Sequence, residues 1–203
     1  MKEYLTRILA PAKTPVAIND LKKHLRLRED DTAEDAYLTS ILNAATGFID
    51  GRDGWLGRCL ISQKWRMVLD YFPDKIIIPL PPLISVDSIT YIDSDGDTQT
   101  ISSANYRVVS DIEPAIIEPV EGYSWPTPDC IDAAVRVNFT AGYGTDAASV
   151  PDMIRHYIKI VCGDMYANRE SIVIGTIASR LEHIADMLEN FRIRGATNAR
   201  RSP

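Results

Sequence analysis

The chain has 203 residues, of which 45% are hydrophobic and 25% are charged, and its formal net charge is −6 at pH 7. This length and hydrophobic share allow a real core, either as one domain or as a domain with an insert. An acidic total argues against general coating of nucleic acid. The sequence has no apolar run long enough to span a bilayer and no signal-peptide pattern, so we expect no membrane association.

The first fifteen residues carry Pro11 and Pro15 and little hydrophobic pattern, and we expect them to form a loosely held arm. A short helix over 19–27 is predicted next, with Asn19 as its N-cap. Thr32 is then expected to cap a longer helix over 33–50. That helix has an apolar stripe at i, i+3, i+4 spacing, formed by Tyr37, Leu38, Ile41, Leu42, Ala45, Phe48 and Ile49.

From Leu60 the apolar period changes from that of a helix to that of a strand. We expect short strands at about 65–69, 76–78, 83–92, 98–101, 106–109, 115–117 and 133–140. Residues 93–97 read DSDGD between two of these strands, which is typical of a hairpin turn. No internal repeat is present.

A core helix is predicted over 150–169, with Pro151 in its first turn. Its apolar stripe consists of Ile154, Tyr157, Ile158, Val161 and Met165, widened by Cys162 and Tyr166. Another helix is expected to begin near Ser179, which forms a capping box with Glu182. Its narrow stripe is followed by an arginine-containing tail without an acid, which composition alone reads equally well as a solubilising terminus or as a binding segment.

The element order is therefore helix, helix, several strands, helix, helix. It predicts an α+β fold, a helical bundle with an inserted block of short antiparallel β-strands, and not alternating βαβ units. We expect a single domain over 1–203, with helices at about 19–50 and 150–192, a β insertion at about 60–141 and a flexible basic tail at 192–203. The helices before the insertion should pack directly on the 150–169 helix.

No set of residues predicts catalysis or metal binding. The DSDGD stretch has its glycine at the fourth position of a calcium loop instead of the sixth, and Ala104 stands where a bidentate Glu is required. His24, His156 and His183 lie on three different predicted helices without a second ligand at metal spacing. No nucleophile elbow, Walker loop or dinucleotide-binding motif occurs. We therefore expect no enzyme, no catalytic residue, no cofactor and no metal.

Three cysteines, Cys59, Cys130 and Cys162, lie far apart and form no CxxC pair. We interpret them as reduced, buried thiols of a cytosolic protein.

Nine short stretches occur in a characteristic order along the chain. They are Pro15-Val16-x-x-x-x-Leu21-Lys22-x-His24-Leu25-Arg26, Glu29-Asp30-Asp31, Leu60-Ile61-Ser62-Gln63-x-Trp65, Leu80-Pro81-Pro82-Leu83-x-Ser85-Val86, Ile89-x-Tyr91-x-Asp93-x-Asp95-Gly96, Asn105-Tyr106-Arg107-Val108, Ala141-Gly142-Tyr143-Gly144, Val150-Pro151-x-x-Ile154-Arg155 and Tyr166-x-Asn168-Arg169-Glu170. In this order they resemble the head–tail connector (adaptor) family of long-tailed bacteriophages and related prophage or gene-transfer particles. The resemblance covers about residues 15–171, while the last helix and the tail match only in placement and character.

This resemblance implies a virion structural protein of the neck, assembled in the bacterial host cytoplasm into a ring of twelve subunits beneath the portal. Such a ring extends the DNA ejection channel and docks the next neck, stopper or tail-completion protein. Double-stranded DNA passes through it without sequence-specific binding. The alternative is a DNA-binding packaging component, for which Leu21–Arg28 is the only short basic helix.

The resemblance also implies that the C-terminal segment grips the portal protein. We therefore expect an interface with the portal or a neighbouring subunit, formed by Leu181, Ile184, Leu188, Phe191, Arg192, Arg194, Arg200 and Arg201. A ring also needs two complementary patches on each chain. The Pro-rich loop with Tyr123 and Trp125 is one candidate, and ordinary packing of Trp125 against the strands is equally open.

Overall fold

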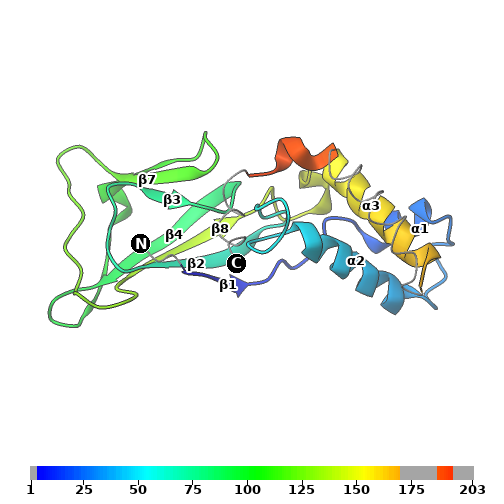
Figure 1. The fold of residues 1–203 in the computed structure, drawn as a ribbon, viewed down its shortest axis with the longest axis horizontal. Coiled ribbons are helices and arrows are strands. Elements are labelled where there is room, and N and C mark those ends of the chain that lie inside the picture. Colours follow the sequence, from blue (N-terminus) through cyan, green and yellow to red (C-terminus); the bar gives the residue numbers. More distant parts are fainter. Residues whose placement is uncertain (1–3, 170–186, 194–203) are drawn as a thin grey trace, which may run out of the picture. The chain divides into compact units, whose positions relative to one another are not determined.

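A computed structural model describes residues 4–169 and 187–193 (Figure 1). Its contacts divide the chain into two compact units. Unit 1 combines Met1–Ala12 with Ser62–Tyr143, and unit 2 combines Lys13–Ile61 with Gly144–Pro203. The α+β class is confirmed, because strands and helices are both well represented in the described chain. The boundaries of a single connector domain stay a prediction.

Unit 1 contains an antiparallel sheet of five strands in the order β1-β2-β8-β4-β5 (Figure 1). The alternation predicted from the sequence sets its two faces, because Trp65 and Met67 are buried while Lys64 is exposed and Arg66 is half-buried. The strands are β1 (Tyr4–Leu9), β2 (Gln63–Leu69), β8 (Val135–Ala141), β4 (Leu83–Ile92) and β5 (Thr98–Thr100).

The expectation of a loose N-terminal arm is wrong for residues 4–9. They form β1, which pairs antiparallel with β2 and places Tyr4 opposite Val68 and Arg7 opposite Trp65. This segment is a strand because it pairs with β2, about sixty residues further along the chain, and a local pattern does not reveal so distant a partner.

Unit 1 also contains a sheet of three strands in the order β3-β7-β6. One face of it is buried, with Ile76 opposite Ile117 and Ile78 opposite Ala115. The strands are β3 (Ile76–Ile78), β7 (Ala115–Pro119) and β6 (Tyr106–Val109).

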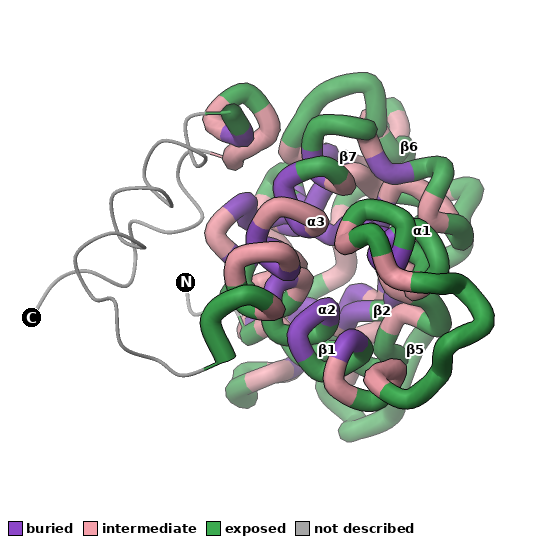
Figure 2. Tube along the Cα trace, turned by 90° about the vertical axis from the view of Figure 1, so that its right-hand side faces the viewer, coloured by how far each residue is buried: buried purple, intermediate pink, exposed green. Residues whose placement is uncertain are grey.

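Unit 2 contains the helices α1 (Ile18–His24), α2 (Asp35–Ile49) and α3 (Asp152–Ala167), which pack against one another as expected. Figure 2 shows the buried segments of α2 and α3 in purple. Four members of the predicted stripes are not core residues, since Phe48 is 59% exposed, Met165 is 36% exposed, and Tyr37 and Tyr166 are half-buried. The buried members are Leu38, Ile41, Leu42, Ala45 and Ile49 on α2 and Ile154, Tyr157, Ile158, Val161 and Cys162 on α3.

The helix boundaries differ from the expected ones for local reasons. Asn19 and Thr32 are not N-caps, because α1 begins after Ala17 and α2 begins after Glu34. The first helix ends at His24 because Arg26 adopts a left-handed conformation with φ of 59°. The amides of Arg26 and Leu27 then bond back to the carbonyls of Lys23 and Lys22, which is the pattern of a Schellman cap.

Two of the three cysteines agree with the expected burial. Cys59 and Cys162 are buried, whereas Cys130 is exposed. Burial raises the pKa of the Cys162 thiol to about 12, so that thiol is not a nucleophile at neutral pH. Within residues 4–169 and 187–193, no helix is both long and apolar enough to cross a membrane.

Candidate interaction surfaces

A buried lysine organises the start of unit 2. Lys22 on α1 is 2% exposed, and its Nζ donates to the carbonyl oxygens of Asp31 at 2.7 Å and Glu29 at 3.3 Å. The carboxylate of Asp35 lies 2.6 Å from the same Nζ as an ion pair, at an angle that is not that of a hydrogen bond. Lys22 therefore holds the acidic loop 29–31 and the start of α2 together, and it is not available to contact DNA.

A second cluster joins the end of α3 to the start of α2. The Tyr166 hydroxyl donates to Glu34, and the Arg169 guanidinium pairs with the same carboxylate. Arg169 also lies over the rings of Tyr37 and Tyr166, at 4.6 Å and 5.1 Å from their centroids. The hydrogen bond from Tyr166 and the charge of Arg169 lower the pKa of Glu34, which therefore stays ionised. The Tyr166–Arg169 stretch of the connector resemblance thus has a structural role in this chain.

The loop after α2 folds back onto the end of its own helix. The amide of Trp55 bonds to the carbonyl of Phe48, and that of Leu56 bonds to the carbonyl of Ile49. A Cβ at Gly54 would lie 2.4 Å from backbone atoms of Ile49 and Asp50, so only glycine fits there. This close return makes residues 51–60 a nearly continuous buried loop.

The described C-terminal residues lie against this loop. Leu188 is 0% exposed, and the amide of Ile193 bonds to the carbonyl of Leu56 at 2.9 Å. The Nε of Arg58 donates to the carbonyl of Phe191 at 2.5 Å, and the Arg192 guanidinium lies 4.7 Å from the centroid of the Trp55 ring. We call the loop residues Trp55, Leu56 and Arg58 the seat of the C-terminal segment.

The structure thus describes only some residues of the expected C-terminal interface. Leu188 is buried in its own unit, and Phe191 and Arg192 are half-buried at the seat. The interface role of these residues stays a prediction. Leu181, Ile184, Arg194, Arg200 and Arg201 lie outside the described residues.

Sequence reasoning missed the seat. The one available signal was the large aromatic Trp55 inside the glycine-rich stretch Gly51, Gly54 and Gly57. Its contact with residue 192 joins segments more than a hundred positions apart, which no local pattern reveals.

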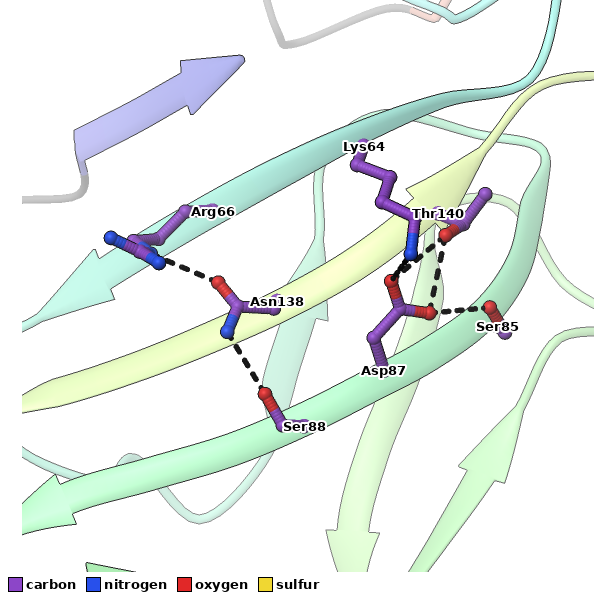
Figure 3. Close-up of polar contacts among 7 residues, drawn as sticks. All are labelled: Lys64, Arg66, Ser85, Asp87, Ser88, Asn138 and Thr140. Carbon is purple, nitrogen blue, oxygen red and sulfur yellow. Dashed lines mark hydrogen bonds and ion pairs between the residues drawn. The ribbon is translucent and has the colours of Figure 1, made fainter. Parts of the chain in front are cut away.

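The polar face of the five-stranded sheet carries two rows of side chains that cross β2, β8 and β4 (Figure 3). In one row, Arg66 donates to Asn138 at 2.9 Å, and Asn138 donates to Ser88 at 2.9 Å. In the other, Asp87 accepts from Lys64, Thr140 and Ser85 at 2.8–3.1 Å (Figure 3).

A β-bulge places Asp87 on this face, since the register of β4 against β8 shifts between Val86 and Ser88. Desolvation raises the pKa of Asp87, but the hydrogen bonds from Ser85, Lys64 and Thr140 outweigh it and leave the pKa lowered. The carboxylate is therefore ionised and committed to holding three strands in register.

The Pro-rich loop packs on its own unit. The rings of Trp125 and Phe72 stack with centroids 5.0 Å apart, and Tyr91 and Tyr123 meet this pair edge-on. Of the two expectations for Trp125, ordinary packing against the strand block is the one observed.

The 93–97 turn is stabilised by the carboxylate of its first residue, Asp93. Asp93 accepts hydrogen bonds from the amides of Asp95 and Asp97 and from the side chain of Gln99, and these bonds lower its pKa. Gly96 takes the left-handed conformation that closes the hairpin, with φ of 86°. Throughout the described part of the chain, no three His, Cys, Asp or Glu side chains are grouped so as to hold a metal ion.

An open pocket of about 340 Å³ lies in unit 1 and is lined mainly by residues 70–71 and 127–132. Two of its three acids hold the surrounding turns, because Asp70 accepts from the amide of Ala133 and Asp129 accepts from the amide of Cys130.

Solved structures with a similar fold are components of gene transfer agent particles. The chain is similar to one from the neck of an empty gene transfer agent (GTA) particle computed with C6 symmetry, with a TM-score of 0.75 and 25% identity over 93% of this chain and 95% of that one. It is also similar to a chain from the virion of a native GTA particle, with a TM-score of 0.73 and 25% identity over 95% and 98% of the two chains.

A chain from the neck of a native GTA particle computed with C12 symmetry has a TM-score of 0.65 over 93% and 94% of the two chains. At 21% identity it supports the shared fold alone. No protein-family model matches this chain. No curated protein matches it either.

Proposed function

We propose that this chain is a structural subunit of the neck, at the head–tail junction of a phage-like particle. The observation that supports it is the similarity to a chain of a GTA neck, which spans 93% of this chain and 95% of that one at a TM-score of 0.75. Both units take part in a match of that length, so the likeness is not that of one common substructure.

The finer proposal is a head–tail connector of the adaptor type. Twelve copies form a ring beneath the portal protein, which extends the DNA channel and docks a neck, stopper or tail-completion protein. The C6 symmetry with which the similar neck was computed supports a ring. In the proposed connector, α1, α2 and α3 of each chain belong to a helical bundle. The ring assembles in the host cytoplasm and remains in the virion.

We propose no catalytic activity and no cofactor. The shifted carboxylates that support this view, Glu34, Asp87, Asp93 and Glu118, all have lowered pKa values caused by structural hydrogen bonds and ion pairs. A general acid needs the opposite shift. The alternative of a DNA-binding packaging component gains little support. In its candidate segment Lys22 is buried, and the exposed Lys23 and Arg28 pair with Glu29 and Asp30.

The test is whether the chain binds the portal protein of the same particle, measured by co-sedimentation and by electron microscopy. Two truncations separate the contributions of the C-terminal segment. Ending the chain after Ile193 removes Arg194, Arg200 and Arg201 but leaves the seat occupied, so we expect an unchanged melting temperature and weaker, less salt-dependent binding. Ending it after Arg180 also removes the buried Leu188, and we expect loss of binding together with a lower melting temperature.

Exposed ion pairs contribute only about 0–1 kcal/mol each, so removal of three arginines should weaken binding without abolishing it. A matched control replaces the three arginines by lysine, which keeps the charge and should keep most of the salt dependence. If the chain truncated after Arg180 binds the portal like the full chain, the C-terminal segment is not the portal grip. If the full chain neither binds the portal nor appears as a ring beneath it, the proposed function is wrong.

A further inference from the structure

Strand β1 presents an exposed apolar row at one edge of unit 1. Tyr4, Ile8 and Leu9 are 52%, 48% and 56% exposed, and we call them the β1 patch. Ile8 sits at an irregularity in the pairing, since Arg7 faces Trp65 and Leu9 faces Lys64. The opposite edge of the sheet, β5, is three residues long and entirely polar. Proteins usually blunt sheet edges in the way that β5 is blunted, so β1 is the edge suited to a partner.

The three-stranded sheet presents a second apolar row on its outer face. Ile77 lies opposite Ile116, and Ile116 lies opposite Val109, so the three side chains share one face. Ile77 is 50% exposed, and Ile116 and Val109 are half-buried. We call this row the β3-β7-β6 patch.

A charged row borders the β3-β7-β6 patch, with one residue on β6, one on β7 and one just before β3. Glu118 pairs with Lys75 at 3.0 Å and with Arg107, which lies opposite it in the register. The patch therefore has an apolar centre and a polar rim, as protein interfaces do.

The two patches lie on opposite sides of the same unit. In Figure 1, β1 runs along the lower side of unit 1, and β3 and β7 run along its upper side. Figure 2, turned by 90°, again shows β6 and β7 above and β1 below. A contact between two copies that joins a lower patch to an upper patch is heterologous and leaves both ends able to add further copies.

We propose that the β1 patch of one copy packs on the β3-β7-β6 patch of the next, and that this contact joins neighbours in the ring. The inference rests on the proposed neck function, because in a closed ring each patch of one copy is covered by a neighbouring copy. A single polar partner does not fit, since both patches are apolar and a head-to-tail ring requires two different complementary surfaces on every chain.

The contact should be weak for one pair of copies. Three side chains on each side cover less than the roughly 800 Å² per partner of a standard interface. We therefore expect dimers and short oligomers only at about 10 μM to 1 mM for the free chain. Assembly on a portal would make each contact effectively intramolecular and so strengthen it.

The test uses sedimentation velocity of the full chain and two variants, Ile8→Glu and Ile77→Glu. We expect the wild type to self-associate with rising concentration and each variant to remain monomeric, with at least a tenfold weaker association. An equimolar mixture of the two variants should form dimers and nothing larger, because it contains one intact copy of each patch per pair. Thr98→Glu, on β5 at the opposite edge of the sheet, is an exposed control that should associate as the wild type does.

Variants that associate like the wild type, a mixture that stays monomeric, or a wild type that is monomeric at 1 mM would each overturn the proposal. Portal binding measured in parallel separates this result from the proposed function. If the wild type binds the portal but patch variants still form normal rings, the contact is wrong and the neck function stands. If the wild type associates head-to-tail but binds no portal, the contact stands and the neck function fails.

Discussion

Several charged and aromatic residues that could suggest a functional site stabilise the fold instead. Lys22 is charged but only 2% exposed. Its ammonium group donates to two backbone carbonyls and forms an ion pair with a carboxylate of the same unit. The carboxylates of Glu34 and Asp87 are likewise held by neighbours on adjoining elements. Removing one partner from such a contact leaves the others desolvated, so the loss in stability exceeds the net worth of the contact.

Replacing Lys22 by Ala should lower the free energy of unfolding by about 2–4 kcal/mol, because the buried ammonium group is lost and two carbonyls and Asp35 lose their partner. The neighbouring Lys23 provides a matched control, since it is 61% exposed and pairs with Glu29 at 3.3 Å. Lys23→Ala should cost no more than about 0.5 kcal/mol. Urea unfolding of the two variants measures the difference, and equal effects would contradict the role given to Lys22.

His24 should make stability depend on pH near neutrality. Burial, the charge of Lys159 and the nearby His156 ring, whose centroid is 6.3 Å from that of His24, lower the pKa of His24 below its usual 6.5. The unfolded chain therefore binds a proton at a higher pH than the folded chain does. Stability is fully present above the unfolded pKa and falls as the pH drops below about 6.5.

We expect the melting temperature to fall between about pH 7.5 and about pH 5.5, and His24→Gln to remove part of that fall. Lys23→Gln, at the next position, should leave the slope unchanged. Carboxylates with lowered pKa values lose their protons well below this window and do not confuse it. A His24→Gln chain with the pH dependence of the wild type would refute the assignment.

At the scale of elements, helix α2, its return loop and residues 187–193 are joined by successive contacts. The loop 51–60 folds back on the end of α2, and residues 187–193 close over that loop through backbone and side-chain contacts. The segment that the connector resemblance associates with the portal is therefore anchored to the helical unit.

Leu188→Ala should test this anchoring. Leu188 is fully buried, and truncation of a buried leucine to alanine costs about 2–5 kcal/mol. Met187 is 37% exposed, and Met187→Ala should change the free energy of unfolding by less than about 1 kcal/mol. Hydrogen exchange should also become faster at Ile193 in the Leu188→Ala chain, because its amide bonds to Leu56. Unchanged stability and exchange would show that the seat is not a stable contact.

At the scale of the whole molecule, the net charge of −6 does not describe every surface. The polar face of the five-stranded sheet carries Lys64, Arg66 and Arg136, with Asp87 among them. Charge summed over a chain therefore bears on solubility and general nucleic-acid affinity, but it does not give the sign of the charge on any one surface.

The melting temperature should not rise with calcium, zinc or ATP, because a ligand that binds only the native state must raise it. The physical reason for calcium is that Asp93 already accepts three hydrogen bonds within its own turn. A scanning fluorimetry series with each ligand measures this. A reproducible rise of several degrees with calcium that Asp93→Asn abolishes would identify the 93–97 turn as a binding site after all.

The sequence by itself determined the elements whose pattern is local. The stripes of α2 and α3 and the alternation of β2 and β8 are readable because hydrophobic period and backbone geometry coincide over consecutive residues. The resemblance to head–tail connectors also rests on short stretches in order, and the comparisons support its coarser part, a likeness to a neck component of a GTA particle. Packing of the early helices on the 150–169 helix followed from two matching stripes and is confirmed.

Only the tertiary structure decided how distant segments meet. The pairing of β1 with β2, the burial of Leu188 and the stacking of Trp125 on Phe72 each join residues that lie about fifty or more positions apart in the chain. It also decided which apolar side chains stay outside, as Phe48 and Ile77 do. Periodicity states that a residue belongs to an apolar row, but burial depends on whether another element covers that row, and the covering element is chosen by the whole fold.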